Sequence, residues 1–112
     1  METKINQIID FAKNGNLDNP QIISEYIVRL AAFMWQSGQN ILEKEIIYSK
    51  KWNEKRLSAS SDKQTDQLMK VEAEWREFEE AKLIQRTILQ TLQAFKKRLA
   101  TLSEEWQNTN NI

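Results

Sequence analysis

Glycine and proline are almost absent from this chain, whose 112 residues include two Gly and one Pro. Turns between β-strands depend on these residues because they supply tight bends and positive φ angles, so a fold of many strands is excluded. Both residues destabilise helix interiors, and their scarcity therefore favours long helices. The sequence predicts an all-α fold.

Three helical segments are expected, at about 2–14, 20–57 and 62–107, within a single all-helical domain covering 1–112. A serine-rich stretch at 57–62 is the best place for a turn between the two long segments. It contains neither Gly nor Pro, so one helix running straight through it is the alternative.

The helix ends carry recognisable signals. Asn19 is a plausible N-cap for the second segment, and Pro20 occupies its first helical position, where a missing N–H costs nothing. Gly15 follows the first segment and is expected to end it in the left-handed conformation. The first segment has one apolar face, which must dock on the rest of the chain because a helix this short is marginal alone; it consists of Ile5, Ile8, Ile9 and Ala12.

Both long segments repeat apolar residues at the 4-3 spacing of coiled coils. In the second segment the expected stripe is Ile27, Ala31, Met34, Gly38, Ile41, Glu45, Tyr48 and Trp52. In the third it is Leu68, Val71, Trp75, Phe78, Lys82, Gln85, Leu89, Leu92, Lys96, Leu99, Ser103 and Trp106. A second stripe in the third segment, which indicates more than one neighbouring helix there, is Ile84, Ile88, Phe95 and Leu102.

These stripes predict the architecture. The two long segments pair as an elongated antiparallel helical hairpin, coiled-coil-like, and the short first helix packs near the open end. A turn near residue 60 places Trp52 near Leu68 and Gly38 near Lys82.

The composition excludes most kinds of catalytic chemistry. The chain has no His and no Cys, so it has no imidazole or thiol catalysis, no disulfide and no zinc site of the usual ligands. We therefore expect no enzyme, cofactor, bound metal or small-molecule substrate. No apolar run is long enough to cross a membrane and the N-terminus does not read as a signal peptide, so the cytoplasm is the expected location.

Charge is balanced, with 16 basic and 16 acidic residues, so any electrostatic function must be local. One such place, here called the basic tip, consists of Lys50, Lys51, Trp52, Lys55 and Arg56. Its cations suit phosphates and its indole could stack on a base, which makes nucleic-acid binding possible but not favoured. The acidic residues at 72–80 could hold a metal, although a solvated helix face is the better interpretation.

Tryptophans distributed along a narrow two-helix rod are hard to bury completely. We therefore expect the chain to bind a protein partner or itself, as a homo-oligomer. The candidate interaction face consists of Trp35, Trp75, Phe78, Ile84, Ile88, Phe95 and Trp106.

Residues 22–107 resemble small phage and prophage proteins that form coiled-coil helical hairpins. The resemblance is carried by the aromatic and small residues of 26–32, by the segment 92–99, and by the Leu102, Glu104, Glu105 and Trp106 that follow it. It implies an accessory role in phage recombination or replication, or inhibition of a host defence enzyme, in the host cytoplasm. It implies no functional residues.

Overall fold

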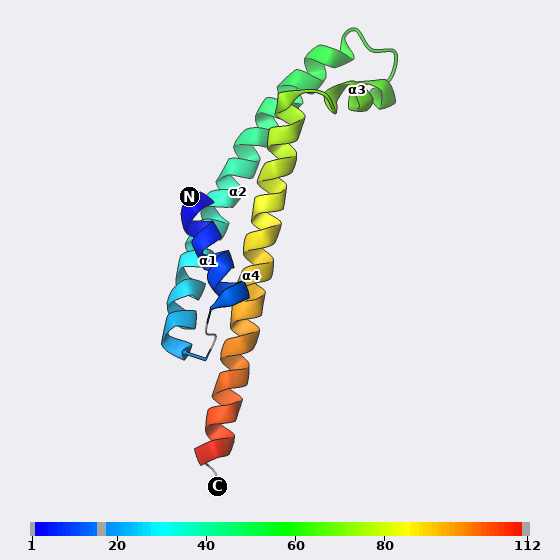
Figure 1. The fold of residues 1–112 in the computed structure, drawn as a ribbon. Helices are drawn as coiled ribbons and strands as arrows, with labels where there is room; N and C mark the ends of the chain where they lie inside the picture. Colours follow the sequence, from blue (N-terminus) through cyan, green and yellow to red (C-terminus); the bar gives the residue numbers. More distant parts are fainter. Residues whose placement is uncertain (1, 16–17, 111–112) are drawn as a thin grey trace. The chain divides into compact units, whose positions relative to one another are not determined.

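The computed structural model describes residues 2–15 and 18–110, and every regular element in these ranges is an α-helix (Figure 1). The helices are α1 (Glu2–Asn14), α2 (Pro20–Arg56), α3 (Asp62–Met69) and α4 (Ala73–Asn110). The prediction of an all-α helical hairpin with a short N-terminal helix is confirmed.

The prediction of one helix over 62–107 was wrong, because α3 ends at Met69 and α4 begins at Ala73. The helical ladder is interrupted after Met69, where the amide of Lys70 donates to the Gln67 carbonyl at 3.3 Å and that of Glu72 to the Met69 carbonyl at 2.9 Å. These i to i−3 bonds tighten the chain, so α3 ends and α4 starts in a new direction. The break buries Met69 completely and leaves Val71 exposed, whereas the expected stripe had included Val71.

The start of α2 follows the prediction. The Asn19 side chain accepts hydrogen bonds from the amides of Gln21 at 3.0 Å and Ile22 at 3.3 Å, so Asn19 is the N-cap. Gly15 does not behave as expected, because no glycine in the described ranges has a positive φ. Its amide instead donates to the Phe11 carbonyl at 2.7 Å, and a Cβ at this position would lie 2.6 Å from that carbonyl oxygen. Glycine is required at position 15 because any side chain there would clash with Phe11.

Contacts group the residues into two compact units. Unit 1 comprises Met1–Trp35 and Arg86–Ile112, and unit 2 comprises Gln36–Gln85. The single-domain assignment stays a prediction.

Unit 1 is a three-helix arrangement of α1, the first part of α2 and the last part of α4 (Figure 1). The Phe11 ring of α1 meets Tyr26 of α2 edge-on at 4.9 Å and lies 6.3 Å from Phe95 of α4. The apolar face of α1 is therefore docked, as a short helix requires. The buried apolar residues around this aromatic cluster are Ile5, Ile8, Ile23, Leu30, Ile88 and Leu92.

Unit 2 is an antiparallel pair formed by the last part of α2 and the first part of α4, with α3 in the connection. The Tyr48 and Phe78 rings lie 5.4 Å apart, and Lys44 and Glu77 form an ion pair at 3.3 Å. Gly38 faces Gln85, three residues beyond its expected partner Lys82.

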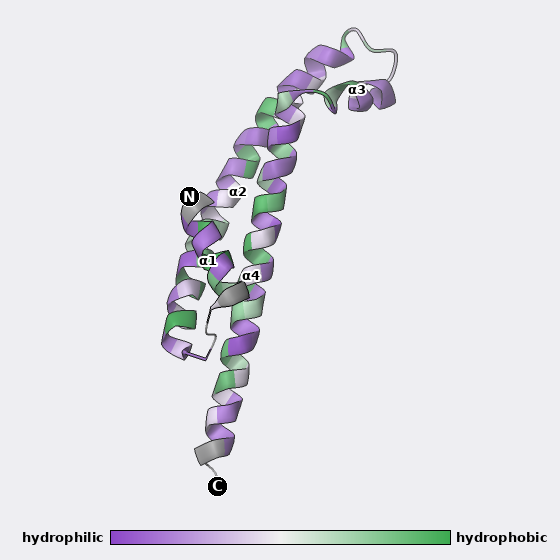
Figure 2. Ribbon diagram, in the orientation of Figure 1, coloured by the Kyte–Doolittle hydropathy of each residue, from purple (hydrophilic) through white to green (hydrophobic). Residues whose placement is uncertain are grey.

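The buried stripes differ from the expected ones. In α2 the most buried residues are Ile23, Leu30 and Ser37, whereas Ala31 and Glu45 of the expected stripe are exposed. In the last part of α4 the core contains residues of the second expected stripe, because this helix must face both α1 and α2. Figure 2 shows hydrophobic residues recurring between hydrophilic ones along α2 and α4, while α3 is mostly hydrophilic.

Candidate interaction surfaces

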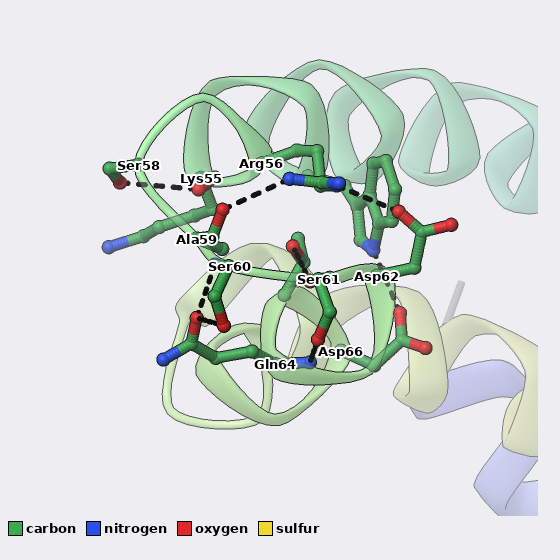
Figure 3. Close-up of polar contacts among 11 residues, drawn as sticks. Lys55, Arg56, Ser58, Ala59, Ser60, Ser61, Asp62, Gln64 and Asp66 are labelled. Atoms are coloured by element: carbon green, nitrogen blue, oxygen red, sulfur yellow. Dashed lines mark hydrogen bonds and ion pairs between the residues drawn. The ribbon is translucent and has the colours of Figure 1, made fainter.

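The connection between α2 and α3 builds a polar network around the basic tip (Figure 3). Ser61 is the N-cap of α3 and accepts from the Gln64 amide at 3.1 Å. The Gln64 side-chain oxygen in turn accepts from the amide of Ser60 at 2.5 Å and from its hydroxyl at 2.7 Å. The Ser61 cap satisfies the Gln64 amide, which the start of α3 would otherwise leave unpaired, and the Gln64 side chain holds the preceding residue Ser60, so the turn is fixed without Gly or Pro.

Three of the five basic-tip residues are engaged within the chain. Arg56 pairs with Asp62 at 2.7 Å and donates to the Ala59 carbonyl at 3.0 Å. The Trp52 indole donates to Asp66 at 2.8 Å, so one edge of the ring is held against α3.

Lys55 forms an ion pair of 2.8 Å with Glu72, the residue that precedes α4. The hydrogen bond with Glu72 raises the pKa of the Lys55 ammonium, and the same bond lowers the pKa of the Glu72 carboxyl. Both groups are therefore held in their charged forms. Lys50, by contrast, is exposed, and Lys51 is half-buried. Two of the four cations of the basic tip, Lys55 and Arg56, are thus paired with carboxylates of the connection that follows.

The residues expected to form the interaction face do not share one surface. Trp35 and Trp106 are each 70% exposed. Three others are half-buried, namely Trp75, Phe78 and Ile84. Ile88 and Phe95 are buried in the core of unit 1, so their inclusion in an exposed face is corrected. The Phe11 ring of α1 and the Tyr26 ring of α2 both lie beside Phe95.

Sequence reasoning missed an exposed apolar stripe on α2, here called the outer stripe: Val28, Ala32, Trp35, Gln39, Leu42 and Ile46. It also repeats at 4-3 spacing, one residue away from the stripe expected to pair. Its four large apolar side chains are 54–70% exposed. The 4-3 spacing alone is enough to identify the outer stripe in the sequence. It does not indicate which of the neighbouring stripes the other helices cover.

Trp106 borders a second apolar feature, an open groove of about 700 Å³ in unit 1. The groove is lined by Asp18, Pro20, Leu99, Leu102, Ser103, Glu105 and Trp106. Arg98 pairs with Asp18 at 2.6 Å and with Glu105 at 3.7 Å, and so joins the segment preceding α2 to the last part of α4.

Three of the five acidic residues at 72–80 form ion pairs, beginning with Glu72 and Lys55. Glu77 pairs with Lys44, and Glu79 pairs with Lys82 at 2.6 Å. Within the described ranges no group of three or more acidic side chains is placed to hold a metal ion. No helix in the same ranges has the length and apolar character needed to span a bilayer.

Comparison with protein-family models, with curated protein sequences and with solved structures found no significant match to this chain.

Proposed function

We propose that this chain is a non-enzymatic protein-interaction and scaffold module that assembles with itself through exposed helical surfaces. The observation that carries this proposal is the exposure of large apolar side chains on the helices, above all Trp35 and Trp106. Exposing such side chains to water is unfavourable, and contiguous apolar surface on a folded chain is typical of interaction sites. Tryptophan is also among the residues that contribute most to binding at interfaces.

The resemblance to small phage and prophage proteins suggests the setting. We infer a mobile-element accessory protein that acts in the host cytoplasm. In the alternative role, as an inhibitor of a host defence enzyme, the same apolar surfaces would contact that enzyme.

Self-assembly is tested by measuring molar mass as a function of concentration with size-exclusion chromatography and light scattering. The proposal expects the mass to rise above that of one chain as the concentration increases through the micromolar range. A mass of one chain at every concentration would remove self-association from the proposal. Screening for a different protein partner would then be needed.

A nucleic-acid accessory role has weaker support, because Lys55 and Arg56 are paired with carboxylates and Trp52 is bonded to Asp66. We expect no binding of single-stranded or duplex DNA at low salt, measured by fluorescence anisotropy. A salt-dependent shift that disappears when Lys50, Lys51, Lys55 and Arg56 are all replaced by Glu would reinstate this role.

A further inference from the structure

The outer stripe has the geometry of an unused coiled-coil seam. From Val28 to Ile46 the steps are 4, 3, 4, 3 and 4, and every position is exposed. α2 is one helix from Pro20 to Arg56, so its periodicity alone places these residues on a common face. The buried residues Leu30 and Ser37 lie on the opposite side of the same helix. A surface with this spacing fits another helix at a shallow crossing angle.

The stripe is complementary to itself when two copies run antiparallel. With residue numbers adding to about 74, Val28 faces Ile46, Ala32 faces Leu42 and Trp35 faces Gln39. The small Ala32 then lies opposite Leu42 and the flexible Gln39 opposite Trp35, whereas Val28 and Ile46 form a pair of two β-branched side chains. No charged residue lies in the stripe, so no unpaired charge is buried.

The charges beside the stripe support the same arrangement. Arg29 and Glu43 lie on one flank, seven residues on either side of Gln36, so an antiparallel partner brings Arg29 of one copy to Glu43 of the other. On the other flank Glu45 of one copy faces the neutral Ala31 of the other, and the two Gly38 residues face each other. Arg29 is more than half exposed, and its ion pair with Glu25 is a surface contact that contributes little. Its guanidinium also lies 5.6 Å from the centre of the Tyr26 ring, and an ion pair with Glu43 of the second copy would compete with these two surface contacts.

We propose that the outer stripe of α2 is a dimer interface, paired antiparallel with the outer stripe of a second copy of this chain. This rests on the proposed self-association and adds the surface, the orientation and the occupant. The paired segment is about 27 Å long, less than three heptads, so the interface is at the small end of specific ones and we expect micromolar affinity.

The first experiment compares two leucines that match in chemistry and in exposure. Leu42 is on the outer stripe and is 54% exposed, whereas Leu83 is on α4 and is 55% exposed. We expect Leu42→Glu to weaken dimerisation at least tenfold and Leu83→Glu to change it less than twofold, as measured by sedimentation equilibrium. Far-UV circular dichroism checks that each variant is folded.

The second experiment tests orientation. Arg29→Glu and Glu43→Arg should each weaken the dimer because they place like charges opposite each other, and the double variant should restore it. The chain has no Cys, so one spin label can be attached at Ser49→Cys. Antiparallel pairing places the two labels about 36 Å apart along the helices, whereas in-register parallel pairing places them side by side. Pulsed electron paramagnetic resonance on the full-length chain distinguishes these distances.

Each outcome decides the proposal. Loss of dimer in Leu42→Glu with long label distances supports it. A wild-type dimer that survives Leu42→Glu, or that gives short label distances, overturns this interface and leaves self-association standing. A monomeric wild type overturns both the interface and self-association, and any partner of the outer stripe would then be a helix of another protein.

Discussion

Replacing Ile88 and its neighbour Leu89 by alanine tests which stripe of α4 forms the core of unit 1. Ile88 is completely buried, whereas Leu89, which belongs to the stripe expected to pair, is 40% exposed. Truncation of a buried Ile to Ala removes its transfer free energy and leaves a cavity, which costs about 2–5 kcal/mol. Alanine returns a few tenths of this through its better helix propensity, so we expect about 3 kcal/mol.

Leu89→Ala should cost much less. Burying a whole leucine stabilises by about 1.5–3 kcal/mol, and Leu89 is only partly covered, so a loss of about 1 kcal/mol is expected. The variants therefore differ by about 2 kcal/mol although the residues are adjacent. The free energies of unfolding come from urea titrations followed by circular dichroism at 222 nm. If Ile88→Ala does not fold, Ile88→Val takes its place in the comparison, and its expected cost is about 1 kcal/mol. A greater loss for Leu89→Ala than for Ile88→Ala would refute the packing.

Substitutions at three further positions test the N-cap of α2 and the connection between α2 and α4. Asn19→Ala removes the N-cap of α2 and should cost about 1 kcal/mol in a urea titration, while Asn19→Ser should cost only a few tenths; equal losses would contradict the cap. Trp52→Phe deletes the indole donor to Asp66 and should cost about 1 kcal/mol beyond its packing change, but if the same substitution costs nothing the hydrogen bond contributes nothing. Glu72→Gln should be less stable than wild type at neutral pH. Because the pKa of Glu72 is lowered in the folded chain, the difference should be present above its ordinary value of 4.5 and vanish as the pH falls through the folded pKa. A difference unchanged at pH 2 would exclude the ion pair as its source.

The sequence was a good guide to the helices because their ends have local chemical causes. The Asn19 cap and the scarcity of Gly and Pro act over a few residues, so they can be identified without tertiary structure. The break at 70–72 has no such signal. Met69 and Thr65 beside it are buried in unit 2, and burial of this kind depends on contacts distant in sequence.

The interaction surfaces were harder to predict for a related reason. α2 has apolar residues in several adjacent 4-3 repeats, and periodicity cannot tell which repeat faces α4 and which faces solvent. The expected stripe through Ala31 lies between the buried one through Leu30 and the exposed one through Ala32. Each neighbouring residue turns the helix by about 100°, so an error of one residue was enough to hide the outer stripe.

The same limit applies to the basic tip. Lys55, Arg56 and Trp52 form a run that suits nucleic acid, but their partners Glu72, Asp62 and Asp66 are supplied by the connection that follows. Charges can be counted from the sequence, but only the fold shows which of them neutralise each other.

Sedimentation equilibrium of the wild-type chain at several concentrations tests the central claim, self-assembly through exposed helical surfaces, most directly. The account predicts a reversible monomer–dimer equilibrium in the micromolar range, with a limiting mass twice that of one chain. A mass of one chain throughout, up to hundreds of micromolar, would contradict it.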